Sequence, residues 1–95
     1  MPSYLIESYL PRSRAGELRV MVDRLRRAAE SLAAEGVQVQ HVRSTFVPGD
    51  ELCLHLLEAG SVAMAGEASR RAAIEPARVV QVLPVAPSEA PGGAR

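Results

Sequence analysis

Six side chains that could bind a metal ion or take part in acid–base chemistry occur in three short segments of the chain. They are Glu7, Tyr9, His41, Arg43, Cys53 and His55. Cys53 and His55 are two residues apart, so in a strand they share one face, with about 6.5–7 Å between their Cα atoms. A cysteine and a histidine at this spacing can reach one soft or borderline metal ion such as nickel, copper or zinc. His41 is the third candidate metal ligand.

A second possibility is that the same residues bind a small anionic ligand. The guanidinium of Arg43 matches the planar oxygens of a carboxylate. Glu7, Tyr9 and His55 complete this candidate ligand-binding set. Arg43 beside His55 disfavours a metal, because a fixed positive charge repels a divalent cation unless Glu7 neutralises it. If the set were an enzyme pocket, Glu7 or His55 would act as the base.

A third possibility is that these side chains have a structural role. A lone cysteine is commonly a core residue, and Glu, Arg and His on a sheet face frequently form a hydrogen-bond network that sets the register of a dimer. The chain contains no GxSxG, HExxH or CxxC motif and no glycine loop that could hold a phosphate. We therefore assign no catalytic residue and expect binding or assembly rather than enzymatic turnover.

The spacing of the apolar residues predicts four strands and two helices that would position these side chains. Apolar residues from Leu18 to Leu32 recur every three or four positions, which is typical of an amphipathic helix. Gly36 can adopt the left-handed conformation that ends such a helix. The expected elements are a strand at 4–10, a helix at 15–35, a hairpin of strands 37–47 and 51–57, a helix that begins after Ser61, and a strand at 79–83.

This order of elements is the βαββαβ pattern of a ferredoxin-like α+β sandwich. Two right-handed crossovers give a four-stranded antiparallel sheet with both helices on one face. We expect this domain to span residues 1–85, and residues 86–95 to form a disordered tail because they contain few apolar groups. The face without helices would expose more apolar surface than a monomer usually shows, so we expect a homodimer.

The hairpin turn decides which side chains lie on the open face of the sheet. If residues 48–50 form a three-residue turn, Phe46 is opposite Leu52 and Ser44 is opposite Leu54. The leucines of the second hairpin strand then lie under the helices. The alternate positions face the open side, which predicts that the candidate residues gather there as one polar pocket: Glu7, Tyr9, His41, Arg43, Cys53 and His55.

Composition places the chain among globular proteins and excludes several functions. The 95 residues are 47% hydrophobic and 23% charged, with eleven basic and eleven acidic residues. This balance gives no electrostatic footprint for nucleic acid, and the apolar runs are too short to cross a membrane. The single cysteine cannot form an intramolecular disulfide, and no secretory leader opens the sequence, so we expect a cytoplasmic protein.

Six segments of the chain match a known pattern of short motifs. They are Met1–Glu7, Val42–Val47, Cys53–His55, Glu58–Ala59, Arg70–Ile74 and Arg78–Val80. Together they resemble the actinobacterial nickel-binding-protein-like domains of unknown function, over nearly the whole chain except the tail. The resemblance implies a dimeric ferredoxin-like sandwich and, for some members, nickel or a similar divalent ion as cofactor. Glu7 and Cys53 are the matched positions of the family pattern.

The chain also departs from this family and from similar folds. Metal-binding members have histidines near the end of strand one and in the second helix, where this chain has Tyr9 and the pair Ala68–Ser69. Similar folds also serve as monooxygenases without a cofactor, which use His, Asn or Trp beside an aromatic-lined cavity. This chain has two tyrosines, one phenylalanine and no tryptophan, which offers such a cavity little.

Overall fold

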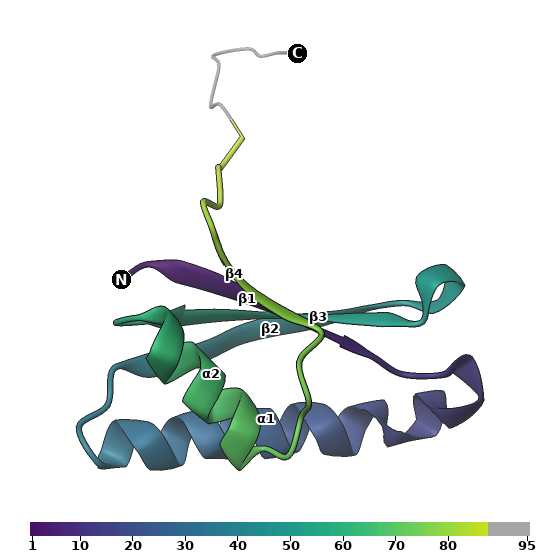
Figure 1. Ribbon diagram of the computed structural model, residues 1–95, viewed down its shortest axis with the longest axis horizontal. Helices are drawn as coiled ribbons and strands as arrows, with labels where there is room; N and C mark the ends of the chain where they lie inside the picture. Colours follow the sequence, from purple (N-terminus) through teal and green to yellow (C-terminus); the bar gives the residue numbers. More distant parts are fainter. Residues whose placement is uncertain (88–95) are drawn as a thin grey trace.

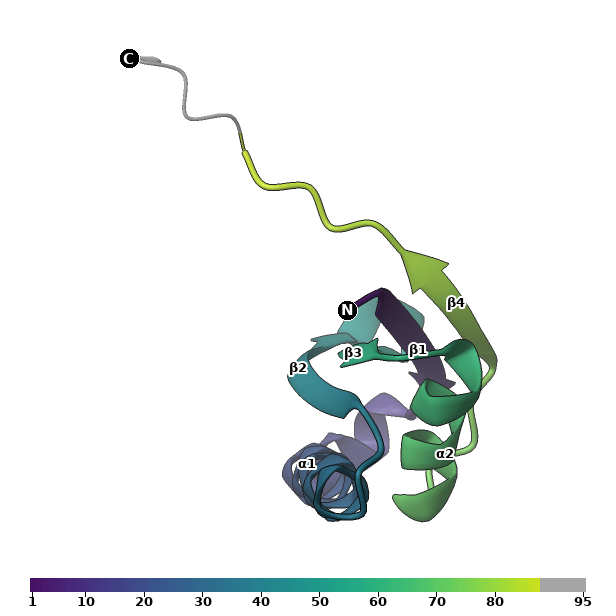
Figure 2. The ribbon, with the colours of Figure 1, turned by 90° about the vertical axis from the view of Figure 1, so that its left-hand side faces the viewer.

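The computed structural model describes residues 1–87, which form a four-stranded antiparallel sheet with two helices on one face (Figures 1 and 2). The elements are β1 (Ser3–Tyr9), α1 (Leu18–Ala34), β2 (Val39–Val47), β3 (Leu52–Ala59), α2 (Val62–Arg71) and β4 (Arg78–Val82), with short 3-10 helices at Arg12–Glu17 and Pro48–Asp50. The strand order is β2-β3-β1-β4. This confirms the predicted ferredoxin-like α+β fold.

Local sequence features mark the start of α2 and the end of α1. The α2 helix starts after Ser61, whose Oγ accepts a hydrogen bond from the backbone N–H of Met64 at 3.2 Å. The α1 helix is followed by Gly36, which has a φ of +88°. The long helix begins at Leu18 rather than at residue 15, because residues 12–17 form a 3-10 helix with a kink at Arg14.

The hydrophobic core lies between the sheet and the helices. Ile6 and Leu57 come from the central strands, and Leu25 and Leu32 come from α1; all four are almost completely buried. The α2 helix contributes small side chains instead, at Ala65, Ala68 and Ala72. Small side chains let α2 pack close to the sheet. Because little space is left between them, the core is filled without many aromatic side chains.

The hairpin between β2 and β3 has a four-residue loop, not the predicted three-residue turn. Val47 pairs with Leu52, and Phe46 pairs with Cys53. The extra loop residue is Glu51, which has a φ of +52°. Its carbonyl oxygen accepts from the Leu10 N–H at 2.9 Å, which helps to hold this unusual conformation. A shift of one residue exchanges the two faces of a strand. The side chains of β3 therefore lie on the opposite faces from those predicted.

A β-bulge at Val42 changes the faces of β2 at its N-terminal end. His41 pairs with Leu57 and Arg43 pairs with Leu56, which leaves Val42 without a partner in the ladder. Residues three apart in a regular strand point to opposite faces. Because of the bulge, His41 and Ser44 lie on the same face, under the helices.

The sequence also predicts a disordered tail at residues 86–95 and no membrane crossing. Most of the predicted tail, residues 88–95, lies outside the described residues. Among residues 1–87, neither helix combines the length and apolar character that a membrane crossing requires.

The packing of β3 predicts the effect of a core truncation. Replacing the fully buried Leu57 by alanine leaves a cavity and should lower the free energy of unfolding by about 2–5 kcal/mol, measured by urea titration. The matched control is Val62→Ala, because Val62 is 50% exposed on α2, and its effect should stay within about 0.5 kcal/mol. Similar losses for both variants would contradict the observed face of β3.

Candidate functional site

The structure separates the six predicted site residues into two groups on opposite faces of the sheet. Glu7, Tyr9 and Arg43 lie on the open face, as predicted, because they share register positions with Leu54, Leu52 and Leu56. The other three lie on the face covered by the helices: His41, Cys53 and His55. The longer hairpin loop places Cys53 and His55 on the helix-covered face, and the bulge does the same for His41. The predicted single polar pocket therefore does not form.

The polar residues of the open face either form an ion pair or are exposed to solvent. The Glu7 carboxylate accepts two hydrogen bonds from Arg78 on β4, at 2.8 and 3.1 Å. This cross-strand ion pair neutralises Glu7. Tyr9 is 69% exposed, and Arg43 is also exposed. Arg43 is therefore separated from the histidine with which it was expected to bind an anion.

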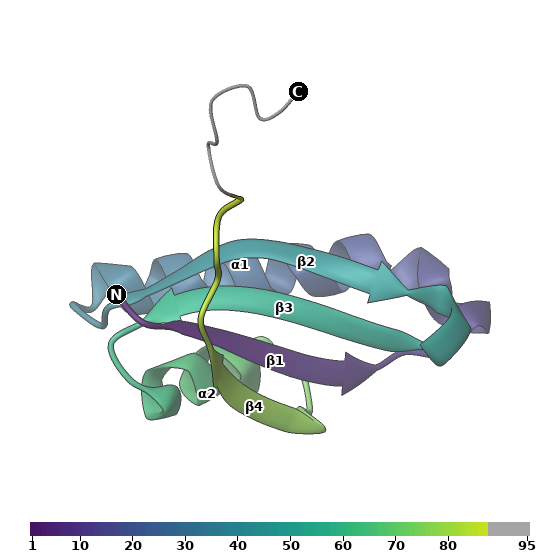
Figure 3. The same cartoon turned by 90° about the horizontal axis from the view of Figure 1, so that it is seen from above.

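Apolar side chains fill the centre of the open face. They come from three adjacent strands and are half-buried: Leu5, Leu52, Leu54, Leu56, Val80 and Val82. Figure 3 looks onto this face, which neither helix of residues 1–87 crosses. A groove of about 290 Å³ runs over it and reaches Leu83 and Pro84 beyond β4. We call this leucine- and valine-rich surface the open-face patch.

The groups under the helices form a chain of alternating imidazoles and hydroxyls. His41 Nε2 is 2.9 Å from Ser44 Oγ, and Ser44 Oγ is 2.7 Å from His55 Nδ1. On its other side, His55 Nε2 is 3.4 Å from Ser8 Oγ. Neutral imidazoles and hydroxyls can each donate one proton and accept another, so the hydrogen bonds can all point from His41 to Ser8 or all point the other way, depending on the tautomers. We call these four residues the buried relay.

Burial keeps the titratable groups of this face uncharged. Desolvation, together with the nearby His41, lowers the pKa of His55 to about 4. Desolvation also lowers the pKa of His41, against a hydrogen bond with the Arg43 backbone. It raises the pKa of the Cys53 thiol, against a hydrogen bond with Ser8. Near neutral pH the site therefore presents neutral imidazoles and a thiol.

This arrangement does not fit the metal ion that was expected at His41, Cys53 and His55. Both ring nitrogens of His55 are already within hydrogen-bond distance of serine hydroxyls. A metal-binding cysteine must be a thiolate, whereas burial raises the pKa of Cys53. Within residues 1–87, no group of three or more His, Cys, Asp or Glu side chains is placed to hold a metal ion.

Sequence reasoning missed Ser8 and Ser44, the two hydroxyls that join the histidines. Ser8 is 2% exposed and belongs to the same strand face as Ile6. The alternation of polar and apolar residues in β1 could have indicated its burial, since Glu7 and Tyr9 were placed on the open face. Ser44 was expected under the helices and is there. Its partner was not anticipated because β3 was given the wrong register.

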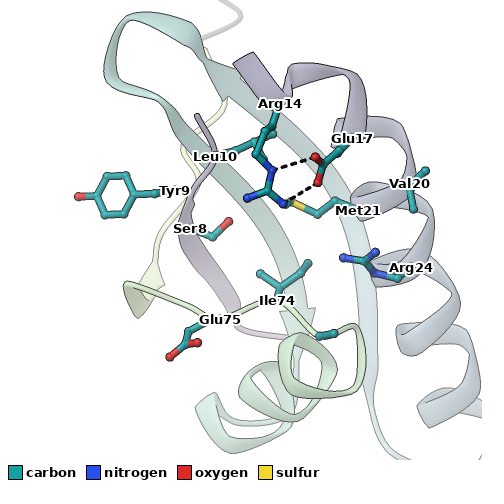
Figure 4. A pocket seen from close by; sticks show the side chains of 11 residues that line it. Ser8, Tyr9, Leu10, Arg14, Glu17, Val20, Met21, Arg24, Ile74 and Glu75 are labelled. Atoms are coloured by element: carbon teal, nitrogen blue, oxygen red, sulfur yellow. Dashed lines mark hydrogen bonds and ion pairs between the residues drawn. The ribbon is translucent and has the colours of Figure 1, made fainter. Parts of the chain in front are cut away.

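Ser8 also lines a cavity of about 310 Å³ at the end of the buried relay. Figure 4 shows this cavity between the end of β1, the start of α1 and the loop that follows α2. Its lining residues are Ser8, Tyr9, Leu10, Arg14, Glu17, Val20, Met21, Arg24, Ala73, Ile74 and Glu75.

Comparisons of the chain with models of protein families, with curated proteins and with solved structures found no match.

Because the pKa of His55 is lowered in the folded protein, we predict that mild acid destabilises the protein. The loss should begin at pH values above those at which carboxylates usually titrate. In the unfolded chain this histidine binds a proton near pH 6.5, but in the folded chain only near pH 4. Its stabilisation is complete above pH 6.5 and is lost as the pH falls. The free energy of unfolding should drop by about 2 kcal/mol between pH 7 and pH 5, measured by urea titration.

The control for this experiment is His55→Gln. Glutamine keeps a donor and an acceptor but does not titrate, so the variant should be less stable at pH 7 and should show a much smaller slope between pH 7 and pH 5. Equal slopes for the variant and the original chain would show that His55 is not buried in its neutral form.

Proposed function

We propose that the protein is a homodimeric assembly module and that the open-face patch is its interface. The observation that carries this proposal is the apolar centre of a sheet face that neither α1 nor α2, the two helices of the described part of the chain, covers. Contiguous apolar surfaces of this kind are uncommon on monomers and typical of interaction sites. Polar groups surround the centre, including Arg43, Thr45 and the Glu7–Arg78 pair, which matches the polar rim of an interface.

The charges of this face favour a second copy of the chain as the partner. A twofold interface brings the same surface from both subunits together, so the surface must be complementary to itself. Glu7 and Arg78 neutralise each other within one subunit. The other charged groups that the four strands place on this face are Arg43 and Glu58, which have opposite signs. A balanced face of this kind avoids the repulsion that a single-sign surface would meet.

The segment after β4 extends this surface. Residues 83–87, which we call the C-terminal arm, leave the sheet on the side opposite the helices (Figures 1 and 2). Leu83 is 81% exposed and Val85 is 88% exposed. Burial of large apolar side chains is worth about 1.5–3 kcal/mol each, so leaving both in water is unfavourable for a lone subunit. A partner on the open face could cover them.

The family resemblance bears on the proposed function in two ways. The resemblance to nickel-binding-protein-like domains implies a dimeric sandwich, which supports this interface. The same resemblance implies nickel for some members, but among residues 1–87 the donor set of His41, Cys53 and His55 does not fit a metal ion. We therefore propose assembly through the sheet and derive no metal-dependent step.

A charge at the centre of the patch should abolish the dimer. Leu54→Arg places a guanidinium in the middle of the proposed interface, where a buried unpaired charge is strongly unfavourable. Light scattering during size-exclusion chromatography at micromolar concentration should give twice the 10.1 kDa chain mass for the original protein and the single-chain mass for this variant.

The matched control is Val62→Arg, which adds the same charge to an exposed valine on α2, far from the open face. This variant should remain a dimer. Circular dichroism confirms that each variant is folded. A monomeric original protein, or a dimeric Leu54→Arg variant, would overturn the proposal.

A further inference from the structure

The cavity beside Ser8 has walls that the fold holds in place (Figure 4). On one side, the hydroxyl of buried Ser69 donates to the Ile74 carbonyl at 2.7 Å, and the Ile74 N–H donates to the Ser69 carbonyl at 2.9 Å. These two bonds fix Ile74, which is 4% exposed, in the cavity wall. On the other side, Met21 projects from α1 with its sulfur toward the same space. The apolar part of the cavity is therefore preformed.

Within residues 1–87, one cation in the cavity wall, Arg24, forms no salt bridge. Glu17, which is paired with Arg14, interacts with Arg24 only at longer range. Arg14 donates to Glu17 through two nitrogens, at 2.8 and 2.7 Å, so its charge is matched. Within residues 1–87, the only hydrogen bond of the Arg24 guanidinium runs from Nε to the Ala72 carbonyl at 3.0 Å. This bond anchors the guanidinium and leaves its Nη groups to meet a ligand. The Glu75 carboxylate points away from the cavity.

Ser8 adds a hydroxyl that can donate a hydrogen bond. Its side chain projects into the cavity, and it is the last member of the buried relay. If His41 donates to Ser44, Ser44 to His55, and His55 to Ser8, the Ser8 hydroxyl has one proton left, which it can donate either to the Cys53 sulfur or to an acceptor in the cavity. The cavity thus combines a guanidinium, a hydroxyl donor and an apolar wall.

We propose that this cavity binds a small monocarboxylate with an aliphatic or aromatic body. The carboxylate would lie between Arg24 and Ser8, and the body would pack on Met21 and Ile74. Arginine favours a planar anion, and a charge-assisted hydrogen bond is about twice as strong as a neutral one. The volume of about 310 Å³ is at the lower end of the range for ligand pockets, which favours a small molecule. The site is separate from the proposed dimer interface, which lies on the other face.

The experiment is an NMR titration of the ¹⁵N-labelled protein with hexanoate, benzoate and the neutral control hexanamide. We expect saturable shifts of the amides of Ser8, Met21 and Ile74 with both acids, and at least tenfold weaker binding of hexanamide. Arg24→Gln should weaken hexanoate binding at least tenfold. Arg27→Gln, on the exposed side of the same helix, should leave the affinity unchanged.

A second variant covers the possibility that Arg24→Gln disturbs the contact with Ala72. Ser8→Ala keeps that contact and removes only the hydroxyl, so it should weaken hexanoate binding severalfold while the spectrum stays well dispersed. The proposal is overturned if no saturable shifts occur at the cavity, if hexanamide binds as tightly as hexanoate, or if folded Arg24→Gln and Ser8→Ala variants both bind like the original chain.

Discussion

The pairing of Val47 with Leu52 closes the hairpin between β2 and β3, and the rest of the molecule depends on it. Because side chains alternate along a strand, this one pairing places Cys53, His55 and Leu57 under the helices. It also places the other leucines of β3 on the open face. The buried relay, the hydrophobic core and the open-face patch are three consequences of the same register. The left-handed Glu51 makes that register possible by supplying the fourth loop residue.

The buried relay in turn supports the register. Burying a polar group without a partner is unfavourable, by about 1–3 kcal/mol. Among the described residues, every buried side-chain nitrogen and oxygen has a hydrogen-bond partner. His55 meets this condition only when Ser44 on β2 and Ser8 on β1 are its neighbours. A shift of either strand would leave the imidazole unpaired, so these hydrogen bonds disfavour other pairings of the three strands.

The sequence predicted the elements of the fold well because they follow from local patterns. The helical spacing from Leu18 to Leu32, the cap at Ser61 and the order of strands and helices all appear in the structure. The faces of the hairpin depended on two features without a clear local signal. Glu51 adopts a conformation that glutamate seldom takes, and Val42 looks like any other strand residue. Each feature shifts the alternation by one residue, and together they separate the predicted site into two.

The two surfaces that result suit different roles. The open face is apolar at its centre and balanced in charge, which suits contact with a second copy. The helix-covered face leads through a row of neutral hydrogen-bonding groups to a small cavity lined by Arg24, whose guanidinium forms no salt bridge within residues 1–87. The open-face patch and the cavity share no residue, so the proposed assembly and the proposed binding would not compete for the side chains that carry them.

Nuclear Overhauser effects across the hairpin test the central claim most directly. Neighbours on one face of adjacent strands have Cβ atoms about 4.5–5.5 Å apart, close enough for strong signals. The Phe46 ring should show contacts with the β-protons of Cys53, and the Thr45 methyl should show contacts with the methyls of Leu54. Contacts from the Phe46 ring to the Leu52 methyls, and from Thr45 to Cys53, would contradict the account.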